Sequence, residues 1–158
     1  MQLERAVRLL CDAGVEFVII GGVSAALHGS ARVTYDLDIC YSRAPPNLRR
    51  LAAALAPYNP RPREFPESLP FVWDEVTLRN GTVFTLQTDL GAIDLLSEVQ
   101  GLGAFDEVKA HSIEVAAFDR RMLTLDLHSL IQAKRAAGRE KDIAGITELE
   151  SLLEAAED

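Results

Sequence analysis

The sequence lacks several features that would place it in specialised protein classes. No apolar run approaches the length of a membrane span, and the N-terminus has no hydrophobic segment of the kind found in secretory signal peptides. The two cysteines, Cys11 and Cys40, form no metal-ligand or redox motif, so we expect free, partly buried thiols. No repeat, low-complexity tract or linker divides the chain. These absences predict a cytoplasmic protein with no membrane partner.

Positive charge is also scarce, because 16 Lys and Arg residues stand against 24 Asp and Glu residues, a net charge of −8. Proteins that grip long nucleic acids need clustered cations to neutralise phosphates, so this balance is not typical of them. One local exception is a stretch rich in arginine. It contains Arg43, Arg49, Arg50, Arg61 and Arg63. A solvated face and a phosphate or nucleic-acid contact both remain open for it.

The hydrophobic periodicity predicts an α/β (α+β) fold with a small mixed β-sheet packed against helices on one side. We expect helices over residues 3–13, 23–27, 48–56, 127–137 and 140–155, with Asn47 and Asp126 as N-caps. We expect strands over residues 16–20, 34–41, 74–79, 82–88, 92–96 and 113–118. Asn80-Gly81 predicts a hairpin, and 113–118 is expected at an edge. A single domain over 1–158 follows, with a core at about 16–118 and a helical part at about 126–155.

The most informative residues are two aspartates that alternate with apolar residues, Asp36 and Asp38. Side chains two positions apart on a strand point the same way, roughly 7 Å apart along the backbone. At about 5 Å and an effective dielectric near 20, two carboxylates repel by about 3 kcal/mol. A solvated edge strand would tolerate the pair, but a divalent cation between the oxygens offsets the repulsion better.

A third acid, Asp94, lies in another expected strand between Ile93 and Leu95. If this strand lies beside the first, three carboxylates meet on the open face of the sheet, although a surface acid remains the alternative. Oxygen-only ligation suits Mg²⁺ or Mn²⁺, which also bind phosphates. Two such ions can activate an attacking oxygen and neutralise a leaving pyrophosphate.

A glycine pair, Gly21-Gly22, stands between an expected strand and an expected helix. Backbone N–H groups and the helix dipole favour an anion there, and glycine lets a phosphate approach the backbone. A Gly-Gly pair alone is weak support for a phosphate site. Thirteen residues between Gly22 and Asp36, joined to the Asp-x-Asp strand, form a much more specific pattern.

Gly21-Gly22, Asp36-Leu37-Asp38 and Asp94 together resemble the signature of the DNA-polymerase-β-like nucleotidyltransferase superfamily. Residues 21–38 look most like bacterial abortive-infection and toxin–antitoxin nucleotidyltransferases, and more loosely like aminoglycoside and lincosamide nucleotidyltransferases. The run from Lys134 through Arg139 to Lys141-Asp142 resembles a helical segment of the first group.

The resemblance implies a minimal nucleotidyltransferase fold. It also implies transfer of a nucleoside monophosphate from a nucleoside triphosphate to a hydroxyl on a protein, a tRNA or a small molecule. Asp36, Asp38 and Asp94 would then hold Mg²⁺ or Mn²⁺, with Asp94 also as the base.

The remaining expected contacts are to the nucleotide. Gly21, Gly22 and Ser24 would bind phosphates, and Arg32 or Lys134 would neutralise the pyrophosphate. A separately encoded partner protein in a toxin–antitoxin or phage-defence system is a further implication.

Two departures from the pattern keep other functions open. Gly22 stands where many members have Ser, and the chain ends soon after the minimal fold. A non-catalytic nucleotide-binding or antitoxin-like partner protein is therefore the first alternative, and an antibiotic nucleotidyltransferase is the second.

Several other residues have two interpretations. His28 could cap the end of a helix or take part in catalysis. Lys134 and Arg139 could lie on an exposed helix face or bind phosphates, and Trp73 could pack in the core or stack on a base. Tyr35 and Tyr41 are expected to face the core.

Overall fold

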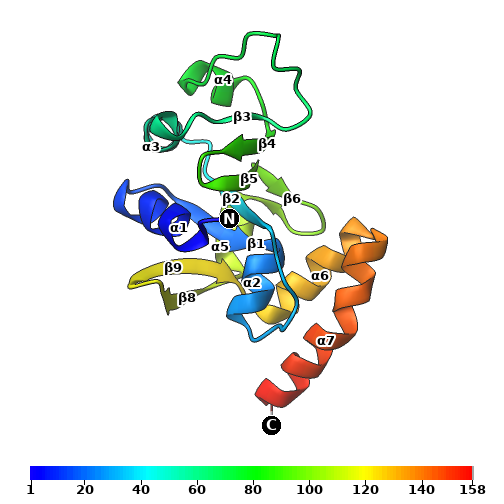
Figure 1. Cartoon of the computed structure of the whole chain (residues 1–158). Coiled ribbons are helices and arrows are strands. Elements are labelled where there is room, and N and C mark those ends of the chain that lie inside the picture. Colours follow the sequence, from blue (N-terminus) through cyan, green and yellow to red (C-terminus); the bar gives the residue numbers. More distant parts are fainter. Residues whose placement is uncertain (158) are drawn as a thin grey trace.

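A seven-stranded mixed sheet forms the centre of the computed structural model, which describes residues 1–157. The strands lie in the order β3-β4-β5-β2-β1-β9-β8 (Figure 1). In chain order these are β1 (Phe17–Ile20), β2 (Asp36–Tyr41), β3 (Arg61–Pro62), β4 (Val83–Thr88), β5 (Gly91–Leu96), β8 (Ser112–Ala117) and β9 (Arg120–Leu125). A separate two-stranded ribbon pairs β6 (Glu98–Val99) with β7 (Gly103–Ala104).

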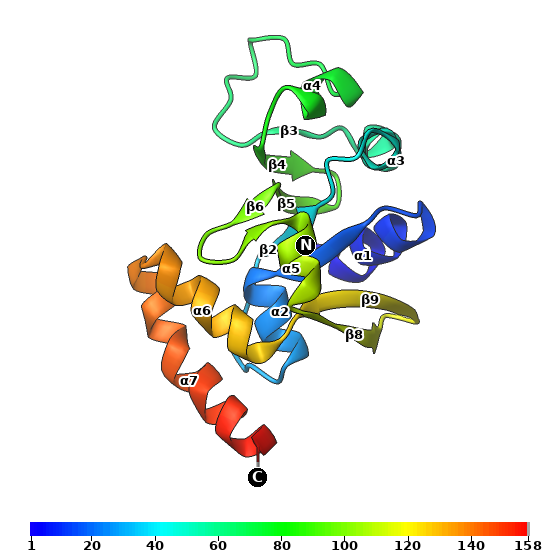
Figure 2. The same cartoon turned by 180° about the vertical axis from the view of Figure 1, so that it is seen from behind.

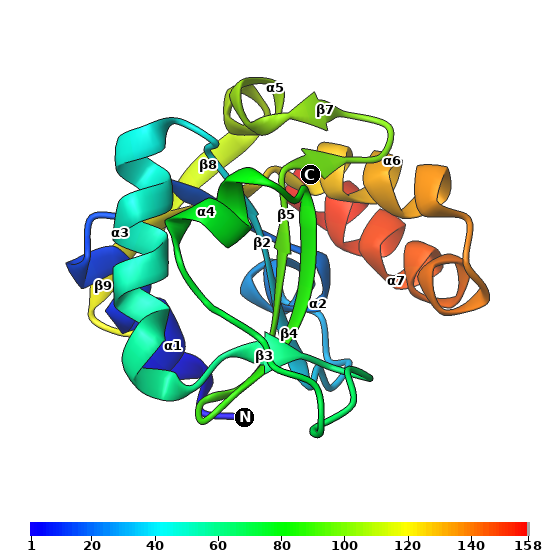
Figure 3. The ribbon, with the colours of Figure 1, turned by 90° about the horizontal axis from the view of Figure 1, so that it is seen from above.

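Helices lie on both faces of this sheet. They are α1 (Leu3–Asp12), α2 (Gly21–Leu27), α3 (Pro45–Leu55), the 3₁₀ turn η1 (Ala56–Tyr58), α4 (Glu75–Arg79), α5 (Phe105–Ala110), α6 (Leu127–Ala137) and α7 (Glu140–Glu157). Seen from above, α1 and α3 lie on one side of the central strands, and α6 and α7 lie on the other (Figure 3). Within residues 1–157, no helix is long and apolar enough to cross a membrane.

The two faces have separate apolar cores. Ile19 and Leu37 point to the first face and pack with α1 and α3. Val18, Ile20 and Cys40 point to the second face and pack with α5, α6 and α7, of which α5 and α6 are seen clearly from behind (Figure 2). The predicted mixed sheet packed against helices is therefore confirmed. Helices cover both faces rather than one, because the strands carry apolar residues on the second face as well.

Local signals explain where the last two helices begin and end. Asp126 caps α6 as predicted, and its carboxylate accepts a hydrogen bond from the Ser129 N–H at 2.7 Å. Gly138 ends the helix in the left-handed conformation, at φ +64°, that favours glycine. The chain then turns directly into α7, which packs beside α6 (Figure 1).

The predicted N-cap at Asn47 is wrong. Helix α3 begins two residues earlier at Pro45, whose fixed φ suits a first helical turn. Asn47 is buried within the helix, where its side chain bonds the backbone N–H and C=O of Glu16 at 2.7 and 3.1 Å. It therefore joins α3 to the start of β1 instead of capping the helix.

The predicted strand over residues 74–79 and its Asn80-Gly81 hairpin are also wrong. This segment forms α4, and the Asp74 carboxylate caps it by accepting from the Thr77 N–H at 2.8 Å. The cap satisfies a helical N–H group that a strand would leave free, and Leu78 is buried against α3.

Other boundaries differ less from the expectation. Helix α2 begins at Gly21, so the glycine pair forms its first turn. The predicted edge strand is confirmed as β8, but its partner β9 and the helix α5 were missed.

Candidate active site

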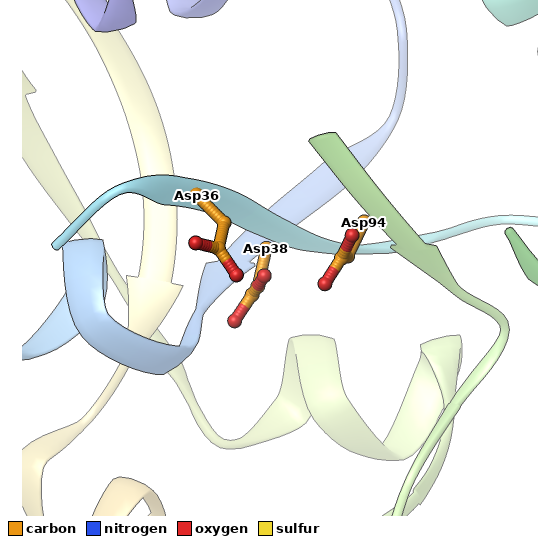
Figure 4. Close-up of side chains that lie close together, drawn as sticks. All are labelled: Asp36, Asp38 and Asp94. Atoms are coloured by element: carbon orange, nitrogen blue, oxygen red, sulfur yellow. The ribbon is translucent and has the colours of Figure 1, made fainter. Parts of the chain in front are cut away.

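Strands β2 and β5 bring the three predicted acids together. The strands run parallel, and Asp38 and Asp94 are direct partners in their register. One carboxylate oxygen from each of Asp36, Asp38 and Asp94 lies within 4.8 Å of the others. All three side chains point to the same side of the strands (Figure 4). The geometry therefore provides the cluster of oxygens that the sequence predicts.

Asp38 is the acid most strongly affected by this crowding. Burial, followed by the charges of Asp94 and Asp36, raises the pKa of Asp38 to about 7. Its Oδ1 atom is buried and has no hydrogen-bond partner among the described residues. An orphaned carboxylate oxygen between two further acids is the environment that a divalent cation would stabilise, so the donor set fits Mg²⁺ or Mn²⁺.

Arg63 is a site residue that the sequence analysis did not single out. It follows the short strand β3, and its guanidinium donates to Asp94 Oδ1 at 2.6 Å and to the Leu86 carbonyl at 2.7 Å. The two contacts fix the guanidinium between β4 and β5. The only sequence signal was the local excess of arginine, which did not indicate which of five arginines would reach an acid.

The glycine pair allows α2 to approach β2 closely. Gly21 has φ +65°, and a Cβ added there would collide with the Asp38 carboxylate. A Cβ added at Gly22 would lie 2.7 Å from the Thr34 hydroxyl. Both positions are therefore closed to larger residues, and the first turn of α2 lies directly against the acids.

Two hollows meet at the acids. The first hollow has a volume of about 290 Å³ and contains Arg32, Thr34 and Gly22. The second hollow has a volume of about 410 Å³ and contains Asp94, Val83 and Leu125. Both are bordered by Gly21, Asp36, Asp38, Lys134, Arg139, Lys141 and Asp142. The acids and three cations thus form a common border between two spaces.

The cations of this border come from α6, from the turn between α6 and α7, and from the start of α7. Burial lowers the pKa of Lys134, although the charge of Asp142 opposes the effect. Arg139 contacts Asp142 through two hydrogen bonds, at 2.6 and 3.2 Å, and the bond to this acid raises the pKa of Arg139. Asp142 is itself buried, and its importance as an anchor for Arg139 was missed from the sequence.

Arg32 reaches the first hollow from the irregular segment between α2 and β2. This segment is attached to α7, because Glu148 accepts hydrogen bonds from the Ser30 hydroxyl at 2.5 Å and from the Ala31 N–H at 3.1 Å. The Arg32 side chain also donates to the Ala144 carbonyl at 3.3 Å. Helix α7 therefore determines where this cation lies.

Ser24 is the one predicted site residue that lines neither hollow. Its side chain is fully buried, and its hydroxyl is hydrogen-bonded to the Thr124 hydroxyl at 2.6 Å. A hydroxyl committed to the core cannot contact a phosphate in the first hollow, so we leave Ser24 out of the proposed site.

The structure also tests the interpretations of four other residues. His28 Nε2 lies 2.7 Å from the Leu125 carbonyl, which links α2 to the end of β9. Trp73 packs against the first core and donates to the Ala52 carbonyl at 2.9 Å. Tyr41 is fully buried as expected, but Tyr35 is 76% exposed and lines the first hollow, so its predicted core position is wrong.

Comparison with known proteins supports the architecture. No protein-family model matches the chain, and no curated protein sequence matches it significantly. The structure is similar to that of the lincosamide antibiotic adenylyltransferase LnuA with lincomycin bound, with a TM-score of 0.63 and 16% identity over 96% of both chains. It is also similar to a candidate nucleotidyltransferase from Thermotoga maritima, with a TM-score of 0.60 and 15% identity over 93% of this chain and 91% of the other. At these identities the likeness shows that the chain shares the fold of these two proteins.

Proposed function

We propose that the protein is a nucleotidyltransferase that transfers a nucleoside monophosphate from a nucleoside triphosphate to an acceptor hydroxyl. The observation that carries this proposal is the convergence of Asp36, Asp38 and Asp94 beside the glycine turn of α2. Three crowded carboxylates and a close backbone approach on one patch are poorly explained by stability alone, because the acids repel one another.

The chain's own residues divide into two groups in this proposal. Asp36, Asp38 and Asp94 would hold divalent cations, which when bound offset the charge of the transferring phosphoryl group. Gly21 and Gly22 leave room for phosphates at the start of α2. Arg32 and Lys134 line the first hollow, where they neutralise the triphosphate and the pyrophosphate that leaves.

The reaction balances as a single displacement. The acceptor oxygen forms a bond to the α-phosphorus, the bond from that phosphorus to the bridging oxygen breaks, and pyrophosphate leaves. Asp94 takes the proton of the attacking hydroxyl, and Arg63, which donates to Asp94 Oδ1, holds this carboxylate in place.

The test is transfer of label from α-labelled ATP, GTP, CTP or UTP with Mg²⁺ to protein, RNA or small-molecule fractions. We expect Asp36→Ala combined with Asp38→Ala to lower the rate of label transfer by several orders of magnitude. Asp106→Asn, at an exposed acid of α5, is the matched control and should transfer label at the wild-type rate. Undiminished transfer by the double variant would refute the proposal.

The alternative of a nucleotide sensor gives a different result in the same samples. Calorimetry would then detect nucleotide binding with Mg²⁺ while no label moves to any acceptor.

A cytoplasmic location and a partner protein of a toxin–antitoxin or phage-defence system stay predictions from the sequence. The neighbouring reading frames test the second of these directly.

The similarity to LnuA favours a small-molecule acceptor as a second, more specific candidate, since the chain and LnuA align over almost their whole lengths. Lincomycin is the obvious first acceptor to test in the labelling assay. Transfer to lincomycin would identify an antibiotic-modifying activity.

A further inference from the structure

We propose that the acceptor is a small molecule that carries no phosphate group and has an apolar face, and that it binds in the second hollow. This proposal rests on the proposed function. The position of Asp94 supports it first. Asp94 lines the second hollow and not the first, whereas Asp36 and Asp38 line both. The attacking hydroxyl must lie next to the acid that takes its proton, so the acceptor belongs on the Asp94 side of the border.

Charge is the second step. Eleven residues line the second hollow without lining the first. They are Ile20, Val83, Thr85, Asp94, Leu96, Val99, Gln100, Leu125, Leu130, Ala133 and Ala137. Asp94 is the one charged residue in this set, and the three cations of the second hollow all lie on the border shared with the triphosphate side. An acceptor with its own phosphates, such as an RNA end, would find no separate counter-charge there.

The apolar lining is the third step. Leu125 and Leu130 are buried and form part of the wall, while Val83 is 59% exposed at the rim. Thr85, opposite Asp94 in the β4–β5 register, and Gln100 supply polar groups beside the reacting acid. A volume of about 410 Å³ suits a small organic molecule that turns its hydroxyl to Asp94 and its apolar part to these side chains.

The shape of the hollow can be changed without touching the acids. Val83→Trp places a large ring at the exposed rim of β4, where the strand already carries a β-branched residue. Gln87→Trp is the matched control, because Gln87 is exposed on the same face of the same strand, four residues on, and does not line the hollow. Ala137→Trp, on the α6 side, fills the same space from a second element.

The experiment is a methyl NMR titration of the full chain with Mg²⁺ and α,β-methylene-ATP, which cannot transfer its nucleotide. Hexyl β-D-glucoside is the uncharged probe with an apolar part, and the dinucleotide pApA is the phosphate-bearing probe. We expect the glucoside to shift the methyl signals of Val99, Leu96 and Leu125 in a saturable way. Its affinity should fall at least about tenfold in Val83→Trp and Ala137→Trp and stay unchanged in Gln87→Trp.

Two results would overturn the inference. One is a methyl spectrum that stays unchanged at the highest glucoside concentration. The other is a set of shifts of the same methyl signals with pApA that equals or exceeds the shifts with the glucoside. Failure of the proposed function is seen separately, as the absence of label transfer in the assay described above. The signals of Val33 and Leu149 show whether the ATP analogue binds in the first hollow. The glucoside titration still reports on the second hollow in that case.

Discussion

At the scale of single residues, Asp38 carries the largest electrostatic cost of the site. Its carboxyl has a pKa of about 7 in the folded chain, against about 3.9 in an unfolded one. The folded state therefore binds this proton more tightly, so without a cation the free energy of unfolding falls as the pH rises from about 4 to about 7. We expect Asp38→Asn to flatten this dependence and to be about 1–3 kcal/mol more stable than wild type at about pH 8.

Urea unfolding in the presence of a chelator, at about pH 5 and about pH 8, measures this difference. Asp106→Asn is the control for loss of a solvated carboxylate. If the free energy of unfolding changes equally with pH in wild type and in Asp38→Asn, Asp38 is not the source of the loss of stability at high pH.

Arg63 is expected to position Asp94 for the reaction. Its two contacts hold the guanidinium between Asp94 and the Leu86 carbonyl, so Arg63→Ala removes the fixed partner of the proposed base. We expect the transfer rate to fall about tenfold or more, and Arg63→Lys to restore part of it, because lysine keeps the charge but not the two-pronged contact.

Initial rates at saturating nucleotide measure this effect. Arg61→Ala is the matched control, since Arg61 lies two residues away and contacts the Pro66 carbonyl, away from the acids. If Arg63→Ala and Arg61→Ala transfer label at equal rates, Arg63 does not position Asp94 for the reaction and is one of several solvated arginines.

At the scale of elements, the junction of β1 and α2 is the most constrained part of the site. Gly21 has a positive φ and lies against Asp38. Gly14 also has a positive φ, +72°, but an added Cβ there would meet only the Arg50 side chain at 3.8 Å. We expect Gly14→Ala to lose about 1 kcal/mol of stability from backbone strain. Gly21→Ala should lose more, because its added Cβ also collides with the Asp38 carboxylate. Only Gly21→Ala should lose nucleotide transfer.

Thermal unfolding and the labelling assay, run on both variants, separate the two effects. If Gly21→Ala transfers label as fast as Gly14→Ala, the close approach of α2 to the acids has no role in the chemistry.

The elements also show what the sequence alone can predict. The β1-α2-β2 unit with its glycines and acids was predicted almost entirely, because alternation, glycine position and strand length are local signals. Helix α4 was predicted as a strand, because the Asp74 cap competes with an Asn-Gly hairpin signal of similar strength. The contact between Arg63 and Asp94 depends on the pairing of β3 with β4 and β4 with β5, which no local pattern encodes.

At the scale of the whole molecule, the mutual repulsion of the three acids links cation binding to stability. A ligand that binds only the folded state stabilises it by about 2.7 kcal/mol at one hundred times its dissociation constant. For a chain of this length that corresponds to a rise in Tm of roughly 5–10 °C. We expect Mg²⁺ or Mn²⁺ to raise the Tm of wild type and to leave Asp36→Ala combined with Asp38→Ala unchanged.

Differential scanning calorimetry over a cation titration measures this rise, with Ca²⁺ as a comparison for a larger ion. A similar shift in the double variant would mean that the cation stabilises the protein elsewhere on its acidic surface.

The central claim is that Asp36, Asp38 and Asp94 hold divalent cations together. Diffraction from crystals grown with Mn²⁺ and α,β-methylene-ATP, recorded at the manganese absorption edge, tests it most directly. The account predicts anomalous density between these three carboxylates, with the phosphates beside Gly21 and Gly22. Manganese bound only at other acids, with the three carboxylates free of it, would contradict the account.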